Sequence, residues 1–307
     1  MPYSLFFGRE CDVTQFFNFF VPPGVKGKTV TIVHDMAYKA CPETVKSRTR
    51  HWLNLVLKKS CNRADIIITV SQFSKDELVR YLGVPKEKIR VMHLGVDQSK
   101  FSNHQSRERI DAVRGKYHIK ERYYLYLGTI EPRKNIKRLL EAYGRLHDKM
   151  SNAPQLVLAG GRGWLCDDIY ETAKALDLGD DILFTGYVEE GEAPVLLAGA
   201  MAFLFPSLYE GFGIPPLEAM ACGTPVLSAD KASLPEVLGD AALLINPESV
   251  DEICMGMERL AVDRALRSEL SRKGSERVKI YTWERSAHIL KGIYEELVTL
   301  EERHAVV

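Results

Sequence analysis

Residues Ser207 to Gly223 read Ser-Leu-Tyr-Glu-Gly-Phe-Gly-Ile-Pro-Pro-Leu-Glu-Ala-Met-Ala-Cys-Gly. An apolar run, Ala202 to Phe205, precedes them and predicts a short strand. Pro215 and Pro216 suit the first turn of a helix, where a backbone N–H has no helical partner to lose. Gly223 occupies the position of a glycine that ends a helix. The stretch therefore predicts a strand, a glycine-containing loop and a short helix, the unit from which open α/β sheets are built.

Two carboxylates in this stretch, Glu210 and Glu218, lie eight residues apart, one in the loop and one in the first helical turn. Open parallel sheets bind ligands in the crevice at the carboxyl ends of their strands, so both side chains can face a ligand there. A glutamate in a first helical turn more often serves only the helix dipole, and for Glu218 that alternative stays open. The backbone N–H groups of residues 211–214 stand beside the positive end of the helix and could bind hydroxyls or an anion.

The same alternation extends over the second half of the chain. Helical patterns there separate six expected strands, at residues 123–127, 155–159, 182–185, 202–205, 225–228 and 242–245. Such alternation predicts a doubly wound parallel sheet. The first half is sparser, with an irregular segment over residues 1–28 and three expected strands at 29–33, 66–70 and 89–94.

The length of 307 residues is enough for two domains. A polar segment over residues 95–115 resembles a linker. We therefore expect a partial N-terminal domain with its linker over residues 1–115 and a C-terminal domain over residues 116–281. A last helix, residues 282–307, is expected to pack back toward the N-terminal domain.

Composition excludes several classes of protein. The formal net charge is zero, so no global field attracts nucleic acid, and none is expected as a partner. The six cysteines are scattered, which favours a reducing compartment over a disulfide framework or a zinc site. No apolar run approaches the roughly 18 residues of a membrane span. We expect a cytoplasmic protein, with peripheral contact to the inner face of a membrane as an open question.

That question arises from a predicted helix over residues 46–63. It carries apolar side chains together with Lys46, Arg48, Arg50, Lys58, Lys59 and Arg63, and it contains no acid. Such a face could contact a membrane surface or a lipid-linked acceptor. The alternative is a solvated helix face.

A cationic motif follows the first strand of the second half, Leu127-Gly-Thr-Ile-Glu-Pro-Arg-Lys-Asn135. Gly128 lets the backbone approach a ligand, and Arg133 and Lys134 begin the next helix, so two cations and a helix N-terminus converge. This pattern favours a diphosphate, although such pairs often only face solvent. A glycine loop that includes Gly161 follows the next strand and is by itself a weak signal. The shared position of these features at strand ends favours one site.

The Glu210-x7-Glu218 stretch, together with Gly-Thr-Ile-Glu-Pro-Arg-Lys-Asn, resembles the retaining glycosyltransferases of family 4 (group 1). The resemblance runs from about Asp12 onward. It implies an α/β fold of GT-B type with two Rossmann-like domains, and transfer of a hexose, with retention, from a nucleotide-diphosphate sugar to an acceptor glycan or lipid-linked sugar. His34-Asp35 followed by Cys-Pro-Glu at residues 41–43 is most similar to mannosyltransferases of polysaccharide biosynthesis.

The resemblance also implies residue roles. Arg133 and Lys134 would hold the donor diphosphate, Glu218 the ribose, and Glu210 the donor sugar, while His34 would lie near the reacting sugar. The implied catalytic residues are His34, Arg133, Lys134 and Glu210. The implied donor-binding residues are Gly128, Arg133, Lys134, Gly161, Tyr187, Val188, Glu210, Gly211, Phe212, Gly213, Ile214 and Glu218. Neither a metal nor another cofactor is expected.

The start of the chain departs from the family pattern. Relatives open their first domain with several strand–helix units and a glycine-rich loop, and these are not found here, so we expect an incomplete N-terminal domain. The alternative function is a non-catalytic or split-enzyme subunit that binds a nucleotide sugar. Such a subunit would need a partner chain supplying the missing strands, or a homo-oligomer.

Overall fold

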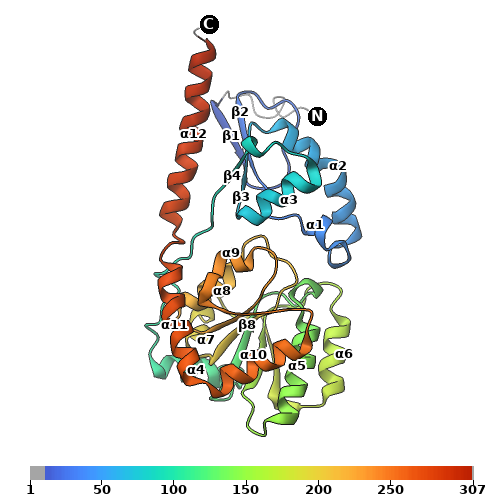
Figure 1. Ribbon diagram of the computed structural model, residues 1–307, viewed down its shortest axis with the longest axis vertical. Coiled ribbons are helices and arrows are strands. Elements are labelled where there is room, and N and C mark those ends of the chain that lie inside the picture. The colour runs from blue at the N-terminus through green and yellow to red at the C-terminus, as the bar shows by residue number, and fades with distance from the viewer. Residues whose placement is uncertain (1–10, 306–307) are drawn as a thin grey trace. The chain divides into compact units, whose positions relative to one another are not determined.

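The computed structural model describes the chain from residue 11 to residue 305. It divides into two compact units. Unit 1 comprises Met1–Gly95 together with Trp283–Val307, and unit 2 comprises Val96–Thr282. Each unit contains its own parallel sheet (Figure 1).

The sheet of unit 1 has four strands in the order β1-β2-β3-β4. They are β1 (Val13–Phe16), β2 (Lys28–Ile32), β3 (Ile66–Thr69) and β4 (Ile89–Val91). The helices of this unit are α1 (Ala37–Ala40), α2 (Ser47–Arg63), α3 (Gln72–Leu82) and α12 (Trp283–Ala305), and two 3₁₀ turns are η2 (Pro42–Thr44) and η3 (Lys86–Lys88). The expectation of three strands was wrong. The segment Val-Thr-Gln-Phe of β1 is too short and polar to stand out, and its pairing with β2 makes it a strand.

Both faces of this sheet are covered, which explains the run of isoleucines in β3. Ile67 packs into a core formed with α2 and α3. Ile66 and Ile68 point the other way, into a core that includes Ile293 and Leu297 of α12. Successive strand residues alternate between faces, so α12 lies on the side of the sheet opposite α2 and α3 (Figure 1). The last helix therefore belongs to unit 1.

The sheet of unit 2 has six parallel strands in the order β10-β9-β8-β5-β6-β7. They are β5 (Tyr123–Leu127), β6 (Gln155–Ala159), β7 (Ile182–Gly186), β8 (Ala202–Phe205), β9 (Val226–Ala229) and β10 (Leu243–Ile245). All six expected strands are present, with shifts of one residue at some ends. The chain builds outward from β5 to β7 and then returns to the other side of β5, so the strand order reverses between β5 and β8. Such a reversal opens a crevice at the carboxyl ends of the two strands.

The helices of unit 2 cover this sheet in two groups (Figure 1). Helices α5, α6 and α10 pack together, as do α4, α7, α8 and α11. Their bounds are α4 (Arg107–Tyr117), α5 (Ile136–Lys149), α6 (Asp167–Leu176), α7 (Ala193–Gly199), α8 (Ile214–Ala221), α9 (Leu234–Leu238), α10 (Val250–Val262) and α11 (Arg264–Val278). Three 3₁₀ turns are η4 (Pro132–Lys134), η5 (Gly179–Asp181) and η6 (Gly239–Ala241).

The boundary between the units differs from the expected one near residue 115. Unit 1 ends at Gly95, and residues 96–115 belong to unit 2. The reason is α4, a polar helix with Val113 buried, which packs against α7. No helix between residues 11 and 305 combines the length and the apolar sequence needed to cross a bilayer.

Candidate functional site

Two loops at the strand-order reversal of unit 2 carry the candidate site. The first follows β5 and passes through η4 into α5. The second follows β8 and ends at Gly213, where α8 begins. The β5 and β8 strands are paired in parallel, so both loops leave the same edge of the sheet side by side. A backbone hydrogen bond of 2.9 Å from Leu208 N–H to the carbonyl of Arg133 ties them together.

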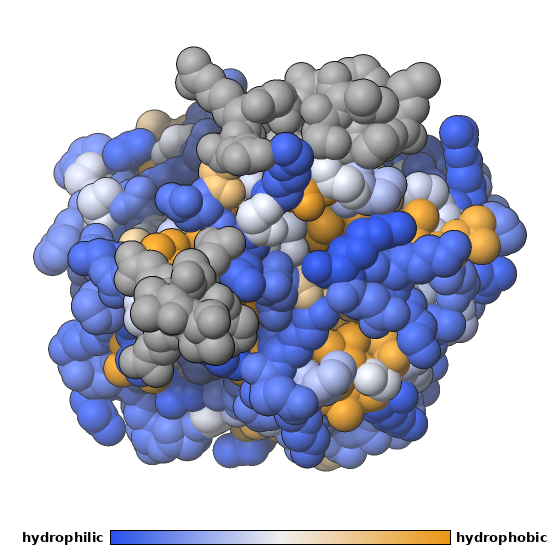
Figure 2. All heavy atoms as spheres, turned by 90° about the horizontal axis from the view of Figure 1, so that it is seen from above, coloured by the Kyte–Doolittle hydropathy of each residue, from blue (hydrophilic) through white to orange (hydrophobic). Residues whose placement is uncertain are grey.

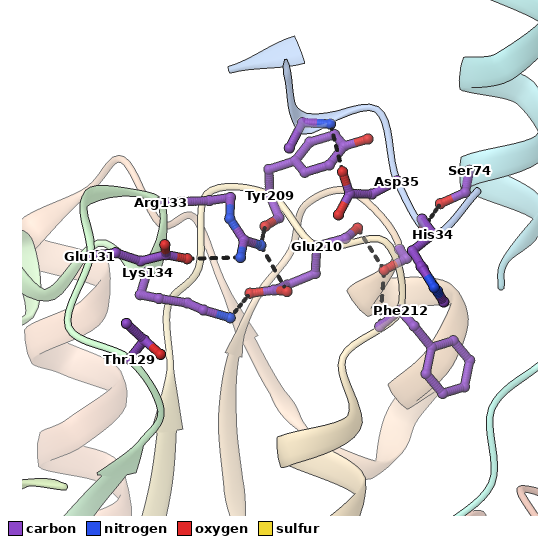
Figure 3. A network of polar contacts seen from close by, with 12 residues as sticks. His34, Asp35, Ser74, Thr129, Glu131, Arg133, Lys134, Tyr209, Glu210 and Phe212 are labelled. Atoms are coloured by element: carbon purple, nitrogen blue, oxygen red, sulfur yellow. Dashed lines mark hydrogen bonds and ion pairs between the residues drawn. The ribbon is translucent and has the colours of Figure 1, made fainter. Parts of the chain in front are cut away.

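A four-charge network joins the loops (Figure 3). Arg133 Nη1 donates to Glu210 Oε2 at 3.0 Å and to the Tyr209 carbonyl at 2.8 Å. Arg133 Nη2 donates to Glu131 Oε1 at 2.8 Å, and Lys134 Nζ donates to Glu210 Oε1 at 2.7 Å. The sequence-predicted residues Arg133, Lys134 and Glu210 are thus brought into direct contact. Two carboxylates face two cations, so the network has no net charge.

Glu210 is ionised in this environment. Its side chain is 10% exposed, and burial alone would raise its pKa. The charges of Lys134 and Arg133 outweigh burial and hold the pKa of Glu210 below its ordinary value. Lys134 itself lies over the ring of Phe205, 5.0 Å from the centroid. A cation held between a carboxylate and an aromatic face has a fixed position at the mouth of the sheet.

Ser233 fixes the loop between Glu210 and α8. Its hydroxyl lies 2.9 Å from the carbonyl oxygens of both Glu210 and Phe212. Gly213 has φ of +107°, a backbone conformation suited to glycine. Phe212 is buried and meets the ring of Tyr281 edge-on, with centroids 5.6 Å apart. The contacts with Ser233 and Tyr281 therefore fix the loop that leads into the N–H groups at the start of α8.

Glu218 has a different environment from Glu210. It lies on α8, and no hydrogen bond or ion pair to its carboxylate is found between residues 11 and 305. Burial raises its pKa to about 7, with a smaller opposing effect from Lys100. A carboxyl with no protein partner and a raised pKa is typical of a group that meets a ligand.

The loops that contain Gly128 and Gly161 approach each other through their backbone atoms. Gly128 N–H donates to the Ala159 carbonyl, and Ile130 N–H donates to the Gly161 carbonyl at 3.0 Å. Close approach is required at Gly160, where a Cβ atom would lie 1.9 Å from the Gly128 oxygen. The structure thus places Gly128 and Gly161 together.

The remaining predicted residues are Tyr187, Val188 and His34. Tyr187, after β7, is 76% exposed, whereas Val188 is buried. His34 follows β2 in unit 1, where its carbonyl accepts a 3.3 Å hydrogen bond from Ser74 Oγ (Figure 3). Among the side chains that the structure describes, no group of three His, Cys, Asp or Glu residues could hold a metal ion.

Sequence reasoning missed three supporting residues. Glu131 and Asn135 lie inside the motif quoted above but received no role. Asn135 is buried and donates to the carbonyls of Pro206 and Pro247 at 3.1 and 2.7 Å. An acid two residues before a basic pair was the available signal for Glu131. No local signal marks Ser233, because its partners lie more than twenty residues earlier in the chain.

Comparison with known proteins agrees with the fold and with the motifs. The family described as "Glycosyl transferases group 1" matches residues 106–277, and "Glycosyltransferase Family 4" matches residues 15–100. The first match covers more than half of the chain. The protein therefore belongs to the group 1 glycosyltransferases, a family of transferase enzymes, and its α/β fold of GT-B type is confirmed.

Two relatives are named as mannosyltransferases. The chain is 35% identical over 268 residues to O-antigen chain mannosyltransferase B of Escherichia coli, covering 87% of this chain and 70% of that protein. It is 32% identical over 246 residues to the E. coli serotype-specific mannosyltransferase WbdA, covering 79% of this chain and only 30% of that protein.

Solved structures show the same fold. Sucrose-phosphate synthase from Thermosynechococcus elongatus superposes with a TM-score of 0.76 at 23% identity, over 97% of this chain and 76% of that one. Anabaena Alr3699/HepE, solved in complex with UDP and glucose, gives a TM-score of 0.75 at 19% identity, over 88% of this chain and 72% of that one.

Proposed function

We propose that this protein transfers a mannosyl unit, with retention of configuration, from a nucleotide-diphosphate sugar to an acceptor glycan or lipid-linked glycan. The observation that carries the proposal is the Lys134–Glu210 contact at the strand-order reversal of unit 2. It places a fixed cation beside an ionised carboxylate at the carboxyl edge of the sheet, where such sheets bind ligands. The mannosyl specificity is supported by the names of the relatives.

The chemistry of the proposed reaction fits these residue types. Negative charge develops on the diphosphate as the glycosidic bond breaks, and a preorganised cation and a helix N-terminus stabilise that charge without rearrangement. Arg133, Lys134 and the N–H groups at the start of α8 would serve this purpose. Glu210 would accept hydrogen bonds from donor-sugar hydroxyls, and Glu218 from the ribose hydroxyls.

Further parts of the proposal concern the other predicted residues. Tyr187 and Val188 would border the base, and His34 would contribute from unit 1 beside the reacting sugar. No metal is assigned to the reaction. As a test, purified protein is incubated with GDP-mannose or UDP-glucose and an oligomannose acceptor, and release of nucleoside diphosphate and the anomeric configuration of the product are measured.

Retained α-linked product from GDP-mannose supports the proposal. An inverted product contradicts retention, and transfer from UDP-glucose alone contradicts the mannosyl assignment. Donor binding without transfer or hydrolysis supports the alternative, a binding subunit that needs a partner chain. Absence of both binding and turnover contradicts the proposed function as a whole.

We also propose a partner for the acid-free helix of unit 1, an anionic membrane surface. Helix α2 buries Leu53 and Leu57 and turns Trp52 and Leu55 outward, 45% and 56% exposed. Exposed Phe20 lies beside Trp52, with ring centroids 6.1 Å apart. The exposed face of α2 also carries Arg48 before Trp52 and Lys59 after Leu55. Aromatic and cationic side chains on one helical face are typical of helices that rest on anionic lipid.

Vesicle co-sedimentation tests this partner. The protein should sediment with vesicles containing phosphatidylglycerol and remain in solution with phosphatidylcholine alone. Trp52→Ser combined with Leu55→Ser should abolish sedimentation, whereas the matched control Met255→Ser, a half-exposed apolar residue of unit 2, should not. Hydrophobic residues on the face shown in Figure 2 form only small separate patches. Equal sedimentation of the double variant and the wild type would refute the assignment.

A further inference from the structure

The most enclosed member of the four-charge network is Glu131, with 2% of its side chain exposed. Its Oε1 accepts the 2.8 Å hydrogen bond from Arg133 Nη2. Its Oε2 is buried and has no hydrogen-bond partner among the described residues. Removing a carboxylate from water is unfavourable unless a countercharge compensates. Arg133 provides that countercharge, so the position of Glu131 is tied to Arg133.

Arg133 is committed to acceptors within the protein. One terminal nitrogen donates to Glu210 and to the Tyr209 carbonyl, and the other donates to Glu131. A guanidinium is planar with its N–H groups in a rigid fork, so three acceptors on two sides fix both its position and its orientation. Only 19% of the side chain is exposed. A donor phosphate could replace these acceptors only by breaking the side-chain hydrogen bonds of Arg133 that join the two loops.

Lys134 differs from its neighbour in this respect. Its ammonium has three N–H donors, and within residues 11–305 one hydrogen bond from it is found, to Glu210. The ammonium can therefore keep that bond and present its remaining N–H donors to a phosphate from the same position.

We infer that Glu131 is a positioning residue. Acting through Arg133, it holds the Glu210 carboxylate and the Tyr209 carbonyl in place, and it leaves Lys134 as the cation that meets the donor diphosphate. This inference rests on the proposed function and changes one part of it, because sequence reasoning assigned the diphosphate to Arg133 and Lys134 alike. The charge balance agrees, because Glu131 balances the charge of Arg133 and Glu210 then balances the charge of Lys134.

Binding of a nucleoside diphosphate separates the roles of the two cations. By calorimetry with GDP and with UDP, Lys134→Gln should weaken binding about tenfold or more, the loss of one charge-assisted contact. Arg133→Gln should change the affinity less than about threefold, because its terminal nitrogens already donate to three acceptors within the protein. If Arg133→Gln weakens binding as much as Lys134→Gln, the inference is overturned. This comparison does not require that any Glu131 variant folds.

Steady-state kinetics test the positioning role itself. Glu131→Gln should lower kcat about tenfold or more while the donor KM changes less than about threefold, because Lys134 still binds the diphosphate and only the alignment of Glu210 is lost. Glu131→Gln combined with Arg133→Gln should be no slower than Arg133→Gln alone, since one residue acts through the other.

A matched control is Asp181→Asn. This carboxylate also contacts two side chains, His147 at 3.0 Å and Lys120, but it lies at the amino end of β7, away from both loops. Its loss should lower the melting temperature and leave kcat and KM unchanged. A folded Glu131→Gln protein with wild-type kcat refutes the inference, as do additive losses in the double variant. Absence of turnover in the wild type would instead contradict the proposed function.

Discussion

Replacement of Glu218 by glutamine should make the protein more stable and a weaker binder of nucleotide. Burial raises the pKa of Glu218 from 4.5 to about 7. A group whose folded pKa is raised binds more protons in the folded state than in the unfolded state, so stability falls as pH rises between the two values. Ionised Glu218 therefore destabilises the fold above pH 7, and glutamine removes that cost.

The expected gain in the free energy of unfolding follows from the pKa shift of Glu218. About 2.5 pKa units correspond to about 3 kcal/mol at pH 8 and less than about 1 kcal/mol at pH 5. The side chain is partly exposed, so solvent screens some of the cost, and we expect a gain of about 1–2 kcal/mol at pH 8. Urea unfolding followed by circular dichroism at both pH values measures it. Exposed Glu171 on α6, changed to glutamine, is the control and should show no such pH-dependent gain.

Binding should change in the opposite direction. An ionised carboxylate that accepts a ribose hydroxyl contributes roughly 1.5–3 kcal/mol, so Glu218→Gln should weaken GDP or UDP binding about 10- to 100-fold at pH 8. Wild-type affinity should rise with pH through about 7, as the carboxylate forms. Two results would refute the reasoning: unchanged affinity in calorimetry, or the same stability difference at pH 5 and pH 8.

Three further predictions concern the two cations of the network, the glycine loop after β6, and whether turnover needs a metal ion. Arg133→Ala together with Lys134→Ala should abolish turnover and leave the circular dichroism spectrum unchanged; surviving turnover would exclude the network from the reaction. Gly160→Ala should destabilise unit 2 by about 3 kcal/mol or more in urea unfolding, because its Cβ would lie 1.9 Å from the Gly128 oxygen at a φ of +148°. The matched Gly161→Ala, with no atom within 4 Å, should be near neutral, and equal losses would contradict this account. Turnover should persist in EDTA, and a loss that Mg²⁺ or Mn²⁺ restores would show a metal requirement.

The fold of unit 2 could be predicted because apolar residues dominate its strands, which glycine, proline or a helical pattern bounds. This composition is typical of strands buried on both faces. Two features of the fold could not be predicted. Strand β1 is short and polar, and it is a strand because β2 lies beside it. Helix α4 buries Val113 as its main apolar contact, so its sequence resembles a linker until α7 packs against it.

The residues of the candidate site were visible in the sequence, but their connections were not. The Ser207–Gly223 stretch and the Arg133-Lys134 pair show by themselves that two polar loops follow buried strands, because local patterns of apolar residues, glycine and proline report local structure. They do not show that Arg133 contacts Glu210, 77 residues away. That contact exists because the strand order reverses and sets β8 beside β5.

The tertiary structure also decided what each charge does. Glu210 and Glu218 are the same residue type in one motif, yet Lys134 and Arg133 lower the pKa of the first, against the effect of its burial, and burial raises the pKa of the second. Sequence determined which ionisable groups stand at the mouth of this sheet. Only the packed structure determined their partners, because a charge responds to every group within a few ångströms, and folding brings those groups together from distant parts of the chain.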